Sequence, residues 1–228
     1  MLLLNPEDEL DAVSEAEVLA GANAALVGEE IVGFRDAVLI APGTYRLSGL
    51  LHGRLGTNDR IAAHGPGEHF VLLSGALGLE RIRDGLGLRS MSRSYKAVSL
   101  WQEETAVAAA SFTNTARGLA PLSPVHLTGS RDGAGNLTIT WIRRTRIPSA
   151  WADGTDVPLG EASERYEIDI RNAANTATLR TISSTSASVT YTATEQAADF
   201  GAPQASVRVR VRQISDTIGR GAAREAIL

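Results

Sequence analysis

The sequence contains no cysteine and only one lysine, Lys96, among its 228 residues. Without cysteine the chain can form neither disulfides nor thiolate metal sites, and its redox compartment is left open. No apolar run reaches the roughly 18 residues that a membrane-spanning helix needs, so we do not expect membrane insertion. The apolar start, Met1 to Leu4, meets acidic residues at once, whereas a secretory signal has a basic start and a longer apolar core.

An excess of positive charge is also missing. Residues 1–118 carry 10 Lys+Arg and 15 Asp+Glu (net −5), and residues 119–228 carry 12 and 11 (net +1), which together give the net −4 of the chain. Neither half has the basic surface that binds phosphates, so we expect no nucleic acid partner. The other 21 basic residues are arginines, which suit carboxylate pairs at interfaces, although codon bias in a GC-rich genome is the simpler explanation.

What the chain does contain predicts a mainly all-β protein. In residues 1–118 we expect a β-rich domain with one short helix, over residues 7–20, where acidic residues at the front precede a loose apolar stripe. From Ala24 onward, short apolar runs broken by glycine favour strands. Further strands are expected in the ranges 45–51, 69–73, 77–83, 94–101 and 109–115.

The second half is predicted to be a separate β-sandwich, residues 119–228. Pro121 and Pro124 follow Gly118 and indicate a short, stiff linker at the boundary. Apolar and polar residues then alternate in several short runs, most clearly in the Val-Arg-Val-Arg-Val-Arg run at 207–212. Turn dipeptides at 132–133 and 135–136 separate such runs, and this spacing over about 100 residues fits a sandwich.

The segment from Gly43 to Leu73 is the most distinctive of the chain. Two strand-like runs flank a region rich in glycine that contains an Arg-x-Gly-Thr turn at 54–57, then Gly67-Glu68 and a Phe-Val-Leu-Leu run at 70–73. This block resembles the tail-tip and baseplate hub proteins of long-tailed phages and of phage-derived gene transfer agents. The resemblance implies a β-rich hub-type domain and a structural protein of the virion, located at the tail tip, that contributes to tail assembly and host attachment.

The same resemblance implies the partners. They would be other tail or baseplate subunits, further copies of the chain in a trimer, and a glycan or protein on the host surface. Such hubs are usually far longer than 228 residues, so the chain would correspond to the C-terminal part of a hub, to a separate small gene, or to a relic in a degenerate prophage.

A second resemblance covers residues 121–228. The Pro-x-x-Pro segment, Trp141, Tyr166 and the Val-Arg repeat resemble a fibronectin type III domain. These domains usually carry a tyrosine at the start of the penultimate strand, where this chain has Ala205, so we expect a looser corner there. Fibronectin-like domains also accompany secreted glycan enzymes. The alternative function is therefore a secreted carbohydrate-binding or adhesion module, against which the missing signal peptide argues.

Residues suited to catalysis or metal binding are few. His64 and His69 flank Glu68, but their spacing matches no zinc signature. Glycosidases need two carboxyl groups held a fixed distance apart, and the acidic residues between 153 and 164 all lie in one loop. Gly85-Leu-Gly87 lacks the third glycine of a dinucleotide fingerprint. We therefore expect no catalytic residue, no cofactor and no metal site, and we do not expect an enzyme.

Two sets of residues are candidates for contact with a partner. The long loop at 147–164 carries Trp151, Asp153 and Asp156, and such loops often carry recognition, with tryptophan enriched at interface hot spots. The other interpretation is that Trp151 covers the sandwich edge. The second set is an outward basic row whose simplest explanation is cross-strand pairing with acidic residues such as Glu167 and Asp169 rather than an anionic partner. This row consists of Arg208, Arg210 and Arg212.

Overall fold

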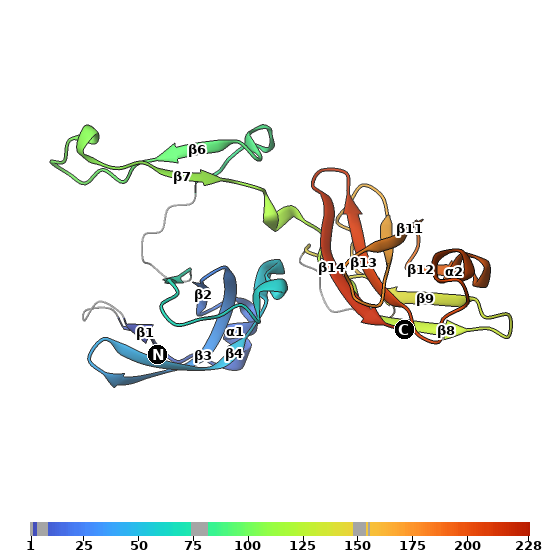
Figure 1. Cartoon of the computed structure of the whole chain (residues 1–228). Coiled ribbons are helices and arrows are strands. Elements are labelled where there is room, and N and C mark those ends of the chain that lie inside the picture. The colour runs from blue at the N-terminus through green and yellow to red at the C-terminus, as the bar shows by residue number, and fades with distance from the viewer. Residues whose placement is uncertain (1, 4–8, 74–81, 148–153, 155) are drawn as a thin grey trace. The chain divides into compact units, whose positions relative to one another are not determined.

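The computed structural model describes residues 2–3, 9–73, 82–147, 154 and 156–228. The chain is built mainly of β-strands, as predicted, and forms two compact units, Met1–Gly85 (unit 1) and Leu86–Leu228 (unit 2) (Figure 1). The sequence predicted a division after residue 118. The predicted and observed divisions differ in the segment 86–118, which was expected in the first domain and belongs to unit 2 in the structure. None of the helices in the described part of the chain is long and apolar enough to span a membrane.

Unit 1 is an antiparallel five-stranded sheet with the order β1-β4-β3-β2-β5. The two apolar runs after Glu30, which the sequence suggested as separate strands, form one long strand that pairs with the next in a hairpin (Figure 1). The predicted runs at 45–51 and 69–73 are confirmed as strands. The bounds are β1 Leu2–Leu3, β2 Ala24–Val27, β3 Glu30–Ala41, β4 Thr44–Leu51 and β5 Phe70–Leu72.

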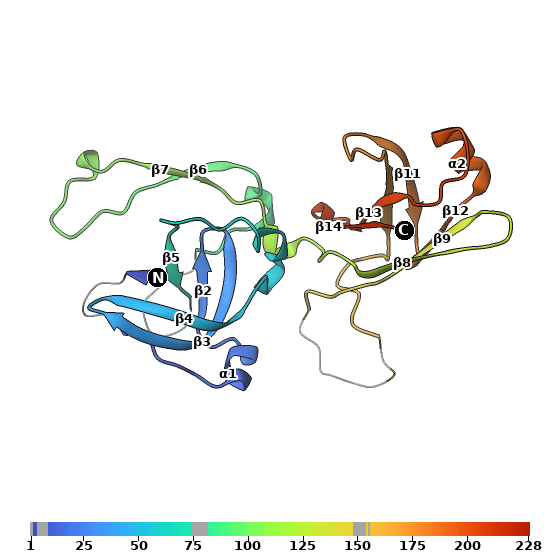
Figure 2. The ribbon, with the colours of Figure 1, turned by 60° about the horizontal axis from the view of Figure 1, so that its bottom comes forward.

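Helix α1, Glu15–Ala20, is shorter than the predicted range of 7–20. It begins where the Ser14 side chain accepts a hydrogen bond from the Glu17 amide while the Glu17 carboxylate accepts one from the Ser14 amide, a reciprocal cap that fixes the start. The helix lies beside β3 (Figure 2). Val18 occupies the space above Gly33, where a Cβ atom would lie only 2.9 Å from Val18 Cγ1.

The core of unit 1 is small. Among the described residues, Leu10, Ala25, Phe34 and Tyr45 form one buried apolar cluster, and Val18 and Val32 are buried as well. Phe70 packs beside Phe34, with 6.4 Å between the ring centroids. A unit with so few buried apolar groups depends more on its polar contacts than a larger domain does.

Unit 2 begins with a hairpin of β6 (Ser92–Tyr95) and β7 (Ala110–Thr113). The predicted strand at 94–101 is wrong beyond Tyr95, because the chain turns at Ser99, whose carbonyl accepts from the Gln102 amide. Of the predicted strand at 77–83, residues 77–81 lie outside the described residues, and 82–83 are not in a strand. Short 3₁₀ turns complete this segment: Leu86–Leu88, Glu104–Ala106 and Arg117–Leu119.

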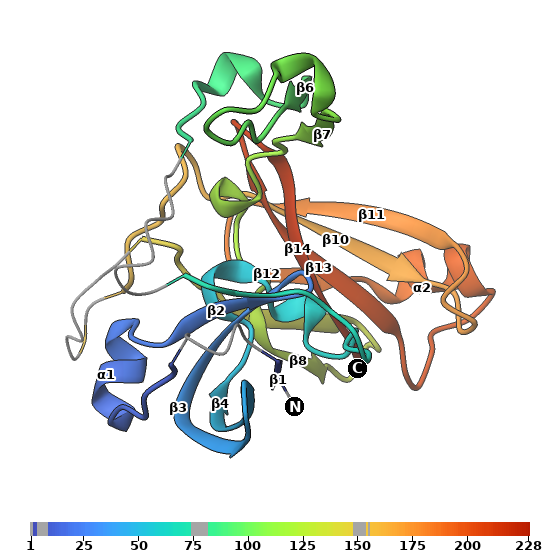
Figure 3. The same ribbon diagram turned by 90° about the vertical axis from the view of Figure 1, so that its left-hand side faces the viewer.

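The rest of unit 2 is a seven-stranded antiparallel sandwich. One sheet has the order β12-β9-β8 and the other β11-β10-β13-β14, the latter side by side in Figure 3. This arrangement of three strands on four is that of a fibronectin type III-like sandwich. The strands are β8 Val125–Arg131, β9 Leu137–Ile142, β10 Tyr166–Arg171, β11 Thr178–Ser184, β12 Ser188–Tyr191, β13 Arg208–Ser215 and β14 Gly219–Ile227.

Alternation along the strands builds the sandwich core, as the sequence predicted. Val207, Val209 and Val211 are buried while the arginines between them face outward. Trp141 of β9 meets Tyr166 of β10 edge to face across the core, with ring centroids 5.0 Å apart. Both aromatic residues that carried the second resemblance therefore lie in the core.

The connection between β12 and β13, which includes Ala205, also contains a helix that the sequence did not predict. Helix α2, Ala193–Phe200, fills the connection between β12 and β13, and a reciprocal cap at Thr192 begins it. The Tyr191 hydroxyl donates to the Asp199 carboxylate at 2.7 Å, and Arg180 of β11 donates to both oxygens of the same carboxylate. These bonds tie α2 to both sheets, because β12 and β11 belong to different sheets.

Candidate functional site

Of the residues predicted for partner contact, Trp151 and Asp153 lie outside the described residues. The structure places Asp156 at the base of the loop, where its carboxylate accepts a hydrogen bond of 2.5 Å from the Arg143 guanidinium. Arg143 also donates to the carbonyls of Val157 and Pro158. The described contacts of Asp156 thus anchor the loop to the end of β9.

Two arginines of the predicted basic row form ion pairs with acidic residues of their own sheet. Arg212 donates to Asp169 at 2.7 Å, which confirms that pairing, and Arg210 pairs with Glu225 of β14. The Arg208 Nε atom is buried without a hydrogen-bond partner in the described part of the chain.

Glu167 pairs with Arg220 rather than with the row. Burial opposes ionisation of Asp169, but hydrogen bonds from Thr181 and Arg212 outweigh it and hold the pKa of this carboxyl below its usual value. Cross-strand pairing therefore accounts for Arg210 and Arg212 without any outside partner.

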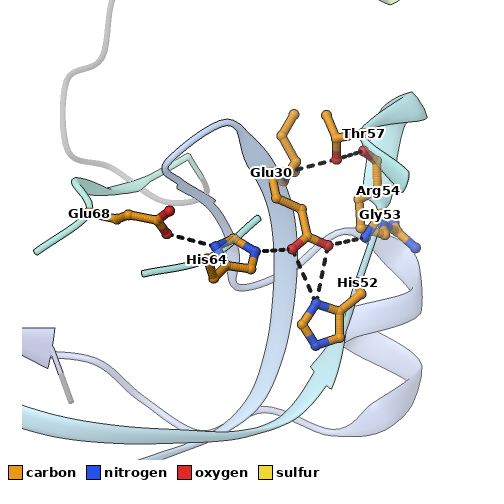
Figure 4. A network of polar contacts seen from close by, with 8 residues as sticks. Glu30, His52, Gly53, Arg54, Thr57, His64 and Glu68 are labelled. Atoms are coloured by element: carbon orange, nitrogen blue, oxygen red, sulfur yellow. Dashed lines mark hydrogen bonds and ion pairs between the residues drawn. The ribbon is translucent and has the colours of Figure 1, made fainter. Parts of the chain in front are cut away.

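Unit 1 contains a polar network that the sequence did not reveal (Figure 4). Its centre is Glu30, the first residue of β3, whose side chain is 0% exposed. One carboxylate oxygen accepts from the Gly53 amide at 2.5 Å and the other lies 2.5 Å from His64 Nε2. His52 Nδ1 lies 3.1 and 3.2 Å from the two oxygens. This buried carboxylate therefore has three donors around it, which is what a charge away from water requires.

The Arg-x-Gly-Thr motif forms the turn predicted for it and is fastened beside this carboxylate. The Thr57 amide and hydroxyl both donate to the Arg54 carbonyl, at 3.1 and 2.8 Å, and the Thr57 hydroxyl accepts from the Ile31 amide at 3.0 Å. Gly53 precedes the turn in a left-handed conformation (φ 65°), and a Cβ atom there would lie 2.9 Å from Asn58 Cα. The start of β3 thus holds this loop through two successive residues.

His64 lies between two carboxylates. Its Nδ1 is 2.7 Å from Glu68 Oε2 and its Nε2 is 2.5 Å from Glu30 Oε2. Ionised carboxylates only accept hydrogen bonds, so both ring nitrogens must carry protons, and the geometry requires an imidazolium. The hydrogen bonds to Glu68 and then Glu30 raise the pKa of His64 against the effect of burial.

The pKa values of the two carboxylates shift in the opposite direction to that of His64. The His64 hydrogen bond lowers the pKa of Glu68. Burial would raise the pKa of Glu30, but the hydrogen bonds from His64, Gly53 and His52 together lower it. The network is therefore a carboxylate–imidazolium–carboxylate triad with His52 at its side.

A cavity of about 440 Å³ lies beside the triad. Its walls are mainly apolar side chains of the sheet, its polar side chains are His52, His64 and Glu68, and Gly65 and Gly67 contribute backbone. The apolar lining consists of Ala25, Val27, Val32, Phe34, Tyr45, Leu47, Leu50, Pro66 and Phe70. An apolar pocket with a few convergent polar groups is typical of a binding site.

The histidines considered in the sequence have different roles. His64 and Glu68 are in contact in the triad. His69 is not part of the triad; its backbone carbonyl accepts a hydrogen bond of 2.9 Å from the Gly28 amide. Within the described ranges no group of three or more His, Asp or Glu side chains is arranged to hold a metal ion. Glu30 was missed, although it shares strand parity with the buried Val32 and Phe34 and could have been placed inward on that basis.

The β6–β7 segment is a second candidate surface that the sequence did not single out. Every residue from 86 to 119 is described and none of them is buried. Trp101 is 96% exposed and adopts a left-handed conformation (φ 71°), and Leu100 beside it is 83% exposed. Met91 and Phe112 are also exposed. A bulky residue in this conformation is strained, and exposed apolar groups of this kind mark interaction surfaces.

The fold and these surfaces define a β-rich protein of two units, the second ending in a fibronectin-like sandwich. Residues 2–71 match the family described as "Rcc01698-like, C-terminal", which covers 70 of the 228 residues and includes Glu30, His52, His64 and Glu68. No curated protein matches the chain. Among solved structures, domains d3–d4 of the rat CD45 extracellular region are similar, with 10% identity over 85% of this chain and 93% of that chain. The TM-score is 0.34, so this likeness carries no functional argument.

Proposed function

We propose that the chain is a structural component of a phage or gene-transfer-agent tail tip or baseplate and contributes to tail assembly and host attachment. The match of residues 2–71 to the Rcc01698-like C-terminal family carries this proposal. It covers the Arg-x-Gly-Thr loop on which the resemblance to hub proteins depends, and that loop is fastened to β3 by Thr57 and Glu30. Proposed partners are other tail subunits and further copies of the chain, in a trimer.

The β6–β7 segment supports a role in subunit contacts. A two-stranded hairpin is at best marginally stable alone in water. This one has no buried residue and presents Trp101, Leu100 and Phe112 to solvent. Tryptophan and other aromatic residues are enriched in the centres of protein interfaces. The hairpin is therefore suited to being covered by a neighbouring subunit in a particle.

Immunogold electron microscopy of particles from the source culture tests the proposal. We expect gold at the tail tip when antibody to this chain is used. Particles without label, together with free chain in the cell or medium, would discard the tail role. In that case the secreted carbohydrate-binding or adhesion module would become the leading function, and a glycan array would examine it.

The W101A variant connects the hairpin to assembly. Trp101 has almost no contact area to lose in the isolated chain, so the melting temperature should stay the same while incorporation into particles falls. L19A, which truncates an exposed leucine of α1, is the matched control and should be incorporated normally. Normal incorporation of W101A would contradict a role of this residue in assembly.

A further inference from the structure

We propose that the cavity of unit 1 binds a guanidinium group, that is, an arginine side chain presented by a partner polypeptide. The inference goes beyond the tail role and stands whether or not that role is correct. It depends on three properties of the cavity: its charge, its aromatic and apolar walls, and the hydrogen-bonding state of His52.

The charge of the site favours a cation. The triad combines the two carboxylates of Glu30 and Glu68 with one imidazolium, His64, and is therefore negative by one unit. Outside the triad, residues 1–85 carry 6 Lys+Arg and 11 Asp+Glu (6 − 11 = −5), so the rest of unit 1 is also net negative. Such a field attracts a cationic group and repels an anion.

The walls favour a guanidinium over an ammonium group. Phe34, Tyr45 and Phe70 line the cavity, and the apolar side chains beside them would cover the aliphatic stem of a long basic residue. Guanidinium is planar and weakly hydrated and it stacks on aromatic faces, whereas an ammonium group is compact and strongly hydrated. The volume of about 440 Å³ lies within the range of small-ligand pockets.

His52 supplies a specific acceptor. Its Nδ1 faces the Glu30 carboxylate and therefore carries the proton. In the neutral imidazole the other nitrogen, Nε2, is then an acceptor, and Figure 4 shows it directed away from Glu30. His52 lines the cavity, so this nitrogen offers an acceptor to an N–H group of a guanidinium, and Glu68, also in the lining, offers a carboxylate.

Histidine-ring NMR of the full chain tests the proposal directly. The chain has four histidines, of which His52 and His64 line the cavity while His69 and His126 do not. Titration with N-acetylarginine amide should shift the ring signals of the first pair and leave the second pair unchanged. N-acetylcitrulline amide has nearly the same shape without the charge and should cause no shift. Equal shifts with both probes, or none up to the solubility limit, would overturn the proposal.

Paired variants locate the binding. E68Q removes one charge and should weaken arginine binding about fivefold, as for a partly exposed ion pair. E29Q makes the same change in charge at an exposed side chain outside the cavity and should have no effect.

A steric test does not disturb the triad. L50W places an indole on a half-exposed lining residue of β4 and should abolish binding, whereas L39W on β3, outside the lining, should not. If arginine binding survives L50W, the cavity is not the site.

Discussion

Removing the Glu30 carboxylate should destabilise unit 1 far more than a surface substitution does. In E30A the Gly53 amide and the Nε2 group of the His64 imidazolium lose a carboxylate acceptor that is 0% exposed. Hydrogen bonds to charged groups are worth about 1.5–3 kcal/mol each, but removal of the carboxylate also relieves its own cost of burial. Breaking a buried charged pair in this way costs about 3–5 kcal/mol. For a unit of this size the melting temperature should fall by at least about 12 °C.

E30Q is the discriminating comparison. Glutamine has the shape of glutamate, and its carbonyl oxygen can still accept from the Gly53 amide. Its amide group can donate to Nε2 of a neutral His64, whose Nδ1 proton still meets Glu68. Every group in the triad then keeps a partner, so we expect a loss of only about 1 kcal/mol in the free energy of unfolding.

The distribution of tryptophan makes the measurement selective. All three tryptophans, Trp101, Trp141 and Trp151, lie in unit 2, and Trp141 is in the sandwich core. Tryptophan fluorescence therefore reports the melting of the sandwich, while calorimetry or amide exchange in β3 reports unit 1. We expect E30A to lower the unit 1 transition and to leave the fluorescence transition unchanged. If E30A and E30Q cost the same, or if both units shift together, the reasoning about the triad is refuted.

Two further predictions concern unit 1. Its stability should be greatest between about pH 4.5 and 6.5. Because the folded state lowers the pKa values of Glu30 and Glu68, their contribution to stability is complete above the usual value of 4.5 and is lost on acidification. Because the folded state raises the pKa of His64, its contribution is complete below 6.5 and is lost as the pH rises through the folded pKa. The melting temperature of the native unit 1 should therefore fall as the pH rises above 6.5, and this fall should be absent in H64Q. An unchanged fall in H64Q would contradict the assignment to His64. G33A should cost about 1–3 kcal/mol because its methyl group meets Val18, and in a double-mutant cycle V18A should recover part of that loss; strict additivity would exclude the contact.

The sandwich was predictable from the sequence because its strands alternate strictly. In β13 every second residue is valine or another inward side chain, so the parity of Val207, Val209 and Val211 fixed both the strand and its buried face. Trp141 and Tyr166 indicated the same architecture. Helix α2 was not predicted because the sequence around Ala205 was compared with a family in which a tyrosine ties this corner. In this chain the tie is made by Tyr191 and Asp199 from elsewhere in the sequence.

The triad was not predictable in the same way, because its members lie far apart in sequence. Glu30 and His64 are 34 residues apart, and the sequence gives no sign that β3 and the loop after β4 meet. His64 and Glu68 are close in sequence, but the metal hypothesis considered for them placed them with His69 rather than with Glu30. The exposed surface of the β6–β7 hairpin was not predicted for a different reason. The alternating run at 94–101 predicted a strand without showing which face is buried, and nothing local indicates that Trp101 will remain exposed.

The triad and the cavity depend on the same residues. A small core such as that of unit 1 cannot hold a long loop by apolar packing alone, and the buried carboxylate of Glu30 supplies the missing anchor through Gly53 and His64. Glu30 also contacts the His52 ring, and His64 contacts the Glu68 carboxylate, so the residues that fix the loop also orient these two side chains at the cavity. A binding site gains affinity when its groups are ordered before the ligand arrives, since the ligand then does not have to supply that ordering. Loss of Glu30 should for this reason weaken arginine binding even where unit 1 stays folded, and E30Q, which keeps the shape, is the variant in which stability and binding can be separated.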